Sequence, residues 1–290
     1  MREITERAFA KLNLSLDVVS RLPDGYHELR MVMQSVTLCD EITITLREDG
    51  VVRTASDLRY LPSDDRNIAV RAAKAFFAKM ELPGLGADIA ITKRIPVCSG
   101  MGGGSSDGAA VLRALNKLLD CGLSLGELEK MGADLGSDIP FCVGGGTALA
   151  GGRGEILTDV TALPPCHIVI CKPAFSISTP ELFGKIDSRN QGYRPDTLGM
   201  LCCLEERDLK GAARRMYNVF EDVLPQKPDD VPKIKSLLLG FGALGAAMTG
   251  TGSAVFGIFD SAEKAASAKS ELDTRYAEVF SAQPVKKIEI

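Results

Sequence analysis

The sequence is poor in residues that hold metal ions or cross-link a fold. It has two histidines, His27 and His167, and none of its eight cysteines lies in a Cys-x-x-Cys pair. Structural zinc sites need closely spaced cysteine and histidine ligands, so this spacing excludes such a site. The N-terminus carries charges and no long apolar run, which argues against a secretory signal. Reduced thiols in a cytosolic protein are the simplest account of the eight cysteines, and we predict a cytoplasmic location.

Strong net charge and unbroken hydrophobic runs are also missing. The formal net charge is -4, whereas nucleic-acid-binding domains are typically basic, so we expect no nucleic-acid partner. Residues 236–259 carry no charge, but glycines interrupt them repeatedly. These interruptions predict the end of a helix and two strands joined by a glycine turn, and they argue against a membrane span. The sequence carries no legible signal for an oligomeric state.

What is present is an ordinary globular composition with mixed strands and helices. A chain of 290 residues is long enough for two domains, and 45% of its residues are hydrophobic. Periodicity predicts strands at 13–19, 31–38, 41–46, 87–92, 168–171, 246–249 and 254–259. Helices are predicted at 67–79, from 105, from 124, and at 179–185, 209–217 and 262–272. Because strands and helices do not alternate strictly, we predict an α+β fold with domains at 1–157 and 158–290.

The most informative segment is rich in glycine and runs from Ile95 to Asp107. It reads Ile-Pro-Val-Cys-Ser-Gly-Met-Gly-Gly-Gly-Ser-Ser-Asp and lies directly before a predicted helix. Glycines let a phosphate approach the main chain, and the helix end adds unpaired N–H donors and a positive partial charge. Ser105 and Ser106 add hydroxyl groups for phosphate oxygens or a magnesium ion. The segment therefore predicts a phosphate-binding loop.

Two common phosphate loops do not match this segment. No Gly-Lys-Ser/Thr follows the glycines, so it is not a Walker A loop, and the Gly-x-Gly-x-x-Gly spacing fails as well. The alternative is a flexible turn that only caps a helix. Three consecutive glycines cost backbone entropy that a plain turn would not need, so phosphate binding is the favoured interpretation.

Several segments resemble the GHMP kinases, a superfamily that includes galactokinase, homoserine kinase and mevalonate kinase. Residues 96–106 are similar to their Pro-x-x-x-Gly-Leu-Gly-Ser/Gly-Ser-Ser loop, with Met101 in the place of leucine. Residues 8–14 (Ala-Phe-Ala-Lys-Leu-Asn-Leu), 135–141 (Leu-Gly-Ser-Asp-Ile-Pro-Phe) and 248–254 (Met-Thr-Gly-Thr-Gly-Ser-Ala) are similar to further motifs. Residues 24–29 (Asp-Gly-Tyr-His-Glu-Leu) resemble a motif of one branch, whose substrate carries cytidine.

This resemblance implies a two-domain α+β fold, an active site in the cleft between the domains, and ATP with magnesium as cofactors. It implies transfer of the ATP γ-phosphoryl group to the 2-hydroxyl of a diphosphocytidyl-methylerythritol in non-mevalonate isoprenoid synthesis. The alternatives are a kinase of the homoserine or mevalonate type, and a non-catalytic nucleotide-binding regulator. Phe9 stands where the family has proline, and Cys98 and Ser99 replace small residues, but these changes remove no group with a chemical duty.

The resemblance also assigns the reacting groups. Asp138 is the expected base for the acceptor hydroxyl, and the ammonium group of Lys11 is expected to lower the pKa of that hydroxyl and offset developing charge. Asn13 lies two residues from Lys11, and on a strand two such residues point to the same face, so we expect Asn13 to bond the substrate. Without the resemblance, the residues favour a structural role for both side chains, with Lys11 a solvated charge and Asp138 a helix cap.

Two further sets of residues follow from the resemblance. At the cytidine end, His27 offers a donor and an acceptor to the cytosine edge, and Tyr26 and Phe183 are expected on the two faces of the base. The alternatives are a hairpin position for His27 and helix core packing for Phe183. The expected ATP contacts are Pro96, Gly100, Gly102, Gly103, Gly104, Ser105, Ser106, Asn67 and Lys93, with Ser106 also a candidate magnesium ligand.

Overall fold

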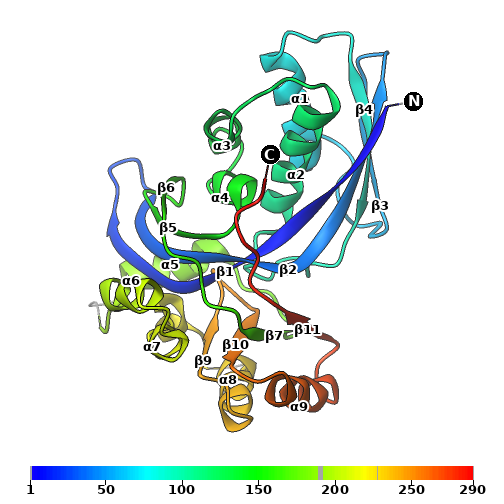
Figure 1. Cartoon of the computed structure of the whole chain (residues 1–290). Helices are drawn as coiled ribbons and strands as arrows, with labels where there is room; N and C mark the ends of the chain where they lie inside the picture. The colour runs from blue at the N-terminus through cyan, green and yellow to red at the C-terminus, as the bar shows by residue number, and fades with distance from the viewer. Residues whose placement is uncertain (1, 189–191, 227, 290) are drawn as a thin grey trace.

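Two sheets, each covered by helices, make up the fold, and the predicted α+β class is confirmed (Figure 1). The structure is a computed structural model that describes residues 2–188, 192–226 and 228–289. The strands of the first sheet are β1 (Glu3–Arg21), β2 (His27–Arg47), β3 (Val52–Ser56), β4 (Gly86–Thr92), β5 (Thr147–Gly151), β6 (Ile156–Asp159) and β8 (Tyr217–Asn218). The sheet is mixed and runs β3-β4-β2-β1-β8, with β5 paired to β2 and to β6.

A long antiparallel hairpin of β1 and β2 forms the spine of this sheet. Its register shifts between Phe9 and Lys11 and again between Asn13 and Ser15. The apolar residues of β1 that lie between the two shifts belong to one hydrophobic core. The apolar residues of β1 that lie outside the shifts belong to another. Register irregularities of this kind re-aim side chains. Two strands were predicted at 31–38 and 41–46, and this was wrong, because β2 continues through the irregularity without a turn.

Four helices lie over one face of the first sheet. They are α1 (Ile68–Lys79), α2 (Gly103–Leu118), α3 (Leu125–Ala133) and α4 (Ile139–Gly144). The helix predicted from residue 105 begins two residues earlier, at Gly103, whereas the predicted start at 67 is confirmed, since Asn67 caps α1 by accepting from the N–H of Ala69 at 2.9 Å. Ser124 begins α3, and its N–H donates to Oε2 of Glu127 at 2.8 Å in a capping box.

The second sheet is antiparallel, in the order β11-β7-β10-β9. Its strands are β7 (His167–Lys172), β9 (Gly245–Met248), β10 (Val255–Phe259) and β11 (Glu278–Ala282). Helices α8 (Asp230–Gly240) and α9 (Ala262–Asp273) cover it, so residues 236–259 form the predicted helix end and two strands. No helix in the described part of the chain is long and apolar enough to cross a membrane.

Further helices connect the two sheets. These are α5 (Thr179–Asp187), α6 (Thr197–Glu205), α7 (Leu209–Arg214) and the 3₁₀ helix η1 (Val219–Val223). The helix predicted at 209–217 ends early because Tyr217 pairs with Ser15 in the parallel ladder of β8 and β1. The domain boundary predicted after residue 157 falls within β6 and stays a prediction. Beyond β11 the chain returns to the first sheet, where Figure 1 shows it rising beside α2 and α4.

Candidate active site

The glycine loop ends in a helix whose first turn has unused donors. Gly102 is the N-cap of α2, with a left-handed φ of 69°, and no side chain caps the helix. The first N–H groups of α2 therefore remain for an anion. The loop is tied to β1, since the N–H of Lys11 donates to the carbonyl of Met101 at 3.0 Å. The glycine loop and the Lys11 strand thus form one unit.

Lys11 and Asp138 meet beside this loop. The Nζ atom of Lys11 lies 3.3 Å from Oδ2 of Asp138, and the lysine side chain is 5% exposed. Lys11 is therefore not a solvated charge. Asp138 occupies the N-cap position of α4, but its side chain makes no capping bond and faces the lysine. The carboxylate is 30% exposed, so it remains open to a substrate from the cavity described below.

Asn13 holds this pair against a second glycine loop, residues 249–252. Its Oδ1 atom accepts from Nζ of Lys11 at 2.8 Å and from the N–H of Gly250 at 3.0 Å. A Cβ on Gly100 would lie 2.2 Å from the carbonyl oxygen of Thr249, so the two glycine loops touch. Asn13 is fully buried and outside the cavity lining. Its expected contact with substrate stays a prediction, whereas its contacts here position the ammonium group of Lys11.

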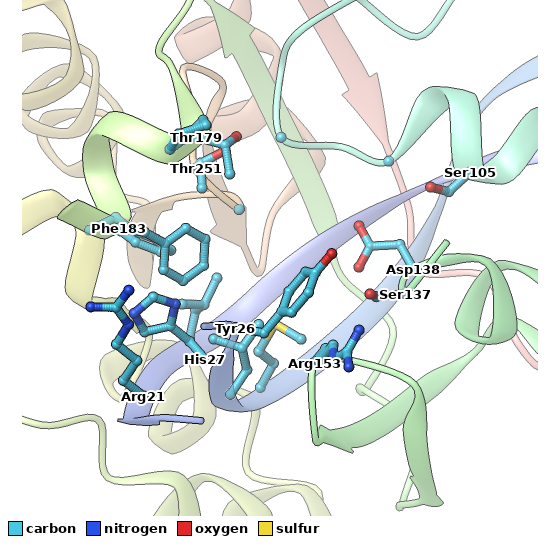
Figure 2. Close-up of a pocket in the computed structure, with 18 of the residues that line it drawn as sticks. Arg21, Tyr26, His27, Ser105, Ser137, Asp138, Arg153, Thr179, Phe183 and Thr251 are labelled. Atoms are coloured by element: carbon cyan, nitrogen blue, oxygen red, sulfur yellow. The ribbon is translucent and has the colours of Figure 1, made fainter. Parts of the chain in front are cut away.

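A cavity of about 740 Å³ opens on the Lys11–Asp138 pair and lies between the two sheets (Figure 2). The first sheet and its helices contribute Lys11, Tyr26, His27, Ser105, Asp138 and Arg153. The other side contributes Thr179, Phe183, Asp187, Phe220 and Thr251. The hydroxyl groups of Thr179 and Thr251 lie 2.8 Å apart, where α5 contacts the second glycine loop. This is the predicted cleft, with one wall from each half of the chain.

The three predicted cytosine-binding residues all line this cavity, with His27 and Phe183 at one end and Tyr26 between them and Asp138 (Figure 2). The Nε2–H of His27 donates to Oδ1 of Asp187 at 2.7 Å. Phe183 stacks on His27, with ring centroids 4.5 Å apart and an interplanar angle of 26°. Tyr26 is 56% exposed, and the guanidinium carbon of Arg153 lies 4.0 Å above its ring. One face of Phe183 is thus occupied by His27, and the aromatic sandwich around a base stays a prediction.

A second cavity, of about 330 Å³, lies on the other side of the glycine loop. Its lining includes the predicted ATP-binding residues Asn67, Lys93, Pro96, Gly100, Gly102, Gly103, Gly104 and Ser105. Gly100, Gly102 and Ser105 line both cavities. The glycine loop is therefore a shared wall, and a group held on it is reachable from both sides.

Lys93 lies at the base of the second cavity between two buried carboxyl groups. Its Nζ atom is 2.5 Å from Oδ2 of Asp40 and 2.8 Å from Oδ2 of Asp107. Burial raises the pKa of Asp107 to about 7, the attraction of Lys93 works against this, and Asp40 adds repulsion. Within the described residues, Oδ1 of Asp107 is buried without a hydrogen-bond partner. The expected contact of Lys93 with ATP has to compete with these two carboxyl groups.

Ser106 is placed differently from its neighbour. Its hydroxyl group donates to the carbonyl of Phe9 at 2.7 Å, and the residue is 1% exposed. It lines neither cavity, whereas Ser105 lines both. Its candidate role as a magnesium ligand stays a prediction, and Ser105 is the serine that a phosphate-bound ion can reach. No group of three or more His, Cys, Asp or Glu side chains that could hold a metal ion occurs among the described residues.

Several residues of the site escaped prediction from the sequence. Asp187 lies 160 residues from its partner His27 and belongs to no motif. Asn218 is fully buried, and its Nδ2 donates to the carbonyl oxygens of Met248 and Gly250 at 2.8 and 2.7 Å. Arg153 stands between Gly152 and Gly154, and a cation in a glycine turn was a signal that could have found it.

The fold and the paired cavities have counterparts among known proteins. Models of the GHMP kinase N-terminal and C-terminal domains match residues 67–146 and 200–278. A solved structure of homoserine kinase from Cytophaga hutchinsonii is 20% identical, covers 99% of this chain and 96% of its own, and has a TM-score of 0.77. The protein is a GHMP kinase, a small-molecule kinase that uses ATP, and its predicted two-domain fold is confirmed.

More similar relatives define the branch of this superfamily. The 4-diphosphocytidyl-2-C-methyl-D-erythritol kinase of Bacillus velezensis is 44% identical over 88% of both chains. That of Alkaliphilus oremlandii is 40% identical over 98% of this chain and 97% of its own. A crystal structure of 4-(cytidine 5'-diphospho)-2C-methyl-D-erythritol kinase, 29% identical, covers 97% and 99% with a TM-score of 0.82. The chain belongs to the 4-diphosphocytidyl-2-C-methyl-D-erythritol kinase family.

Proposed function

We propose that the protein transfers the γ-phosphoryl group of ATP to the 2-hydroxyl of 4-diphosphocytidyl-2-C-methyl-D-erythritol, in non-mevalonate isoprenoid precursor synthesis. One observation carries the proposal. The glycine loop is the wall between two cavities, and the Lys11–Asp138 pair lies on the side that also holds Tyr26, His27 and Phe183. ATP in the smaller cavity and the cytidine substrate in the larger one bring phosphate and hydroxyl together at this wall.

The roles of the two charged groups follow from their geometry. Asp138 accepts the proton of the attacking hydroxyl, since its carboxylate lines the larger cavity. The ammonium group of Lys11, held 3.3 Å from that carboxylate, stabilises the negative charge that develops on the hydroxyl oxygen. The N–H groups at the start of α2 hold the transferred phosphate. Positioning and electrostatics suffice for direct transfer, so no covalent enzyme intermediate is needed.

A magnesium ion accompanies ATP in this proposal. Magnesium usually keeps several waters and binds through substrate phosphates with one or two protein ligands, which suits a site without a carboxylate cluster. The residue that fits it is Ser105, since it lines both cavities at the glycine loop. The ion neutralises charge on the phosphates when it is bound.

At the cytidine end, His27 reads the base. Because its Nε2–H is bonded to Asp187, Nδ1 is left as an acceptor for the amino group of cytosine. We also propose the cytoplasm as the location, which the eight unpaired cysteines support. A division near residue 157 is supported by the two domain models, which match on either side of it.

The test is ADP release from Mg-ATP in the presence of the cytidine substrate. We expect release from the parent protein and a loss of at least about 100-fold in kcat in Asp138→Asn. Asp134→Asn is the matched control, because Asp134 is exposed and four residues away on the same segment. Phosphorylation of homoserine or mevalonate in place of the cytidine substrate would move the chain to a sister activity. No turnover of any of the three would favour the regulator.

A further inference from the structure

The proposed substrate places a diphosphate between its two recognised ends. Cytosine lies at Tyr26 and His27, the reacting hydroxyl lies at Lys11 and Asp138, and the diphosphate connects them covalently. It must therefore cross the middle of the cavity. A diphosphate in a partly enclosed cavity needs a cation or N–H donors, because burying an unpaired charge is costly.

We propose that Arg153 binds this diphosphate and makes the site selective for a diphosphate-linked cytidine. This rests on the proposed function. Its guanidinium carbon lies 4.0 Å from the ring centroid of Tyr26. The next residue, Gly154, lies beside the catalytic pair, since a Cβ there would be 3.7 Å from Oδ1 of Asp138. The turn between β5 and β6 thus reaches from the cytidine end to the catalytic pair. Figure 2 shows the arginine next to Tyr26 and below Ser137.

The other cations of the described cavity lining are less suited to this task. Lys11 is buried and bonded to Asn13 and Asp138, so its ammonium group is directed at the reacting hydroxyl. Arg21 lies beyond His27, 3.5 Å from Asp187, with its side chain 63% exposed. Figure 2 shows it at the far end of the cavity from Asp138. Arg153 is the guanidinium that contacts Tyr26 and directly precedes Gly154, the glycine beside Asp138.

Arg153 has donors available for a phosphate. Its Nη2 donates to Asp24 at 2.7 Å, and a guanidinium carries five N–H donors in all. Both side chains of this pair are more than 40% exposed, so the pair is weak and screened by salt. A guanidinium matches two phosphate oxygens in a fork, and such pairs are stronger than a surface ion pair. Arg153 can therefore turn from Asp24 to the diphosphate, or bond both.

The backbone under Arg153 is fixed. Its own N–H donates to Oε2 of Glu155 at 2.7 Å, and the carbonyl of Gly152 accepts from the N–H of Leu29 at 2.7 Å. The turn is thereby anchored to β2, the strand that begins at His27. The backbone of Arg153 therefore stays at a constant distance from the cytosine-binding residues. A ligand fits only if its diphosphate lies at the matching distance from its base.

The test compares the binding of CDP and of cytidine to the whole protein by calorimetry. We expect the parent to bind CDP at least about tenfold more tightly than cytidine. Arg153→Gln should lose most of that advantage and leave cytidine affinity nearly unchanged. Arg153→Lys should retain part of it, since the charge remains and the fork is lost. With the full substrate, Arg153→Gln should raise its KM and leave the KM of ATP unchanged.

Arg21→Gln is the matched control, because it removes the same charge from the same cavity. It should keep the CDP advantage. The proposal is overturned if Arg153→Gln keeps the parent's preference for CDP, or if Arg21→Gln loses as much of it. If the parent binds neither CDP nor cytidine, the proposed function itself fails. If the parent prefers CDP and Arg153→Gln keeps that preference, only this inference fails, so the two failures are distinguishable. Unchanged thermal unfolding of Arg153→Gln confirms that the exposed turn still folds.

Discussion

At the scale of single residues, Lys11 carries the most specific assignment. Its side chain is buried, and it has two oxygen partners, Oδ1 of Asn13 at 2.8 Å and Oδ2 of Asp138 at 3.3 Å. An ammonium group fixed from two sides does not reorganise when charge develops on a nearby oxygen, and this preorganisation is what makes electrostatic catalysis effective. In the proposed mechanism Asn13 acts through Lys11, as a positioning residue.

We predict that Lys11→Met lowers kcat by about 100-fold or more. The KM of ATP should change little, because the glycine-loop N–H groups remain. Methionine has nearly the same length as lysine and keeps the apolar packing of the stem, so the fold should persist. Steady-state ADP release measures the first effect, and thermal unfolding measures the second. A variant with the parent's kcat would remove Lys11 from the catalytic step.

Asp107 gives a prediction about pH. Burial raises its pKa to about 7, whereas in the unfolded chain the carboxyl group has its ordinary value near 3.8. Between about pH 4 and 7 the unfolded state releases this proton and the native state keeps it. The contribution of this group to the free energy of unfolding therefore falls as pH rises through that window.

Asp107→Asn removes this titration and leaves an amide oxygen to accept from Lys93. We expect the variant to gain stability relative to the parent as pH rises from 5 to 7. Denaturant unfolding of both proteins at the two pH values measures this difference. Parallel pH dependence in the two proteins would mean that Asp107 is ionised throughout. Asp57→Asn serves as the control, because Asp57 is an acid whose pKa is lowered, chiefly by the backbone N–H of Lys93, the same residue that contacts Asp107.

At the scale of elements, the glycine loop is shaped by one close approach. Gly102 has φ of 69°, and a Cβ there would lie 3.0 Å from Cγ of Lys11. The loop thus needs glycine twice, for the left-handed backbone and for the lysine stem that passes beside it. The same approach brings the N-terminus of α2 to the reacting groups.

We predict that Gly102→Ala displaces Lys11 and lowers kcat by about tenfold or more, with about 1 kcal/mol of lost stability from the left-handed backbone. Gly126→Ala is the control, since it lies in α3 and an added Cβ there meets no atom within 4 Å. Kinetics and thermal unfolding of both variants give the comparison. Equal activity in the two variants would show that the loop tolerates the side chain.

The sequence predicts elements well where one periodicity runs through them and poorly where tertiary pairing decides. The alanine-rich composition predicts the helix at 67–79 and the capping box at Ser124 predicts the next one, and both are confirmed. The two-residue strand β8 exists only because Tyr217 and Asn218 lie beside β1, which no local pattern encodes. Register shifts change which face of the sheet the residues of β1 point to. The alternation of apolar and polar residues alone therefore does not predict which core each residue joins.

The same distinction holds for the site. The glycine loop is a contiguous signal, and physical reasoning from its residues alone predicts that it binds phosphate. The meeting of Lys11 with Asp138 depends on how α4 lies against β1, and only the family resemblance supplied it. Asp187 and Arg153 lie outside the motifs, and their partners His27 and Tyr26 are distant in sequence.

At the scale of the whole molecule, the larger cavity has walls from both halves of the chain, so activity depends on how the halves are held. The C-terminal segment beyond β11 is one such connection (Figure 1). The N–H of Val285 donates to the carbonyl of Ser35 at 2.8 Å, and the N–H of Ile288 donates to the carbonyl of Gly144 at 2.8 Å. The segment thus ties the second sheet to β2 and to the end of α4.

This tie acts on the helix that begins at Asp138. Helix α4 has six residues, and Gly144 is its last. A Cβ on Gly145, the C-cap of α4, would lie 2.9 Å from Ile288, so the isoleucine packs directly on the helix end. We predict that deletion of residues 284–290 lowers the free energy of unfolding by roughly 2–3 kcal/mol, from lost hydrogen bonds and packing. It should also lower kcat, because a loosened α4 misplaces the carboxylate.

Lys287→Ala is the control for the charge that the deletion also removes. Lys287 pairs with Asp159, but both side chains are largely exposed, so the pair should contribute under about 1 kcal/mol. Thermal unfolding and ADP release, measured on both proteins, decide between two roles for the segment. A fall in stability with an unchanged kcat would limit it to holding the fold. A fall in kcat at temperatures where the deleted protein is still folded would mean that the position of Asp138 depends on a contact made at the opposite end of its helix.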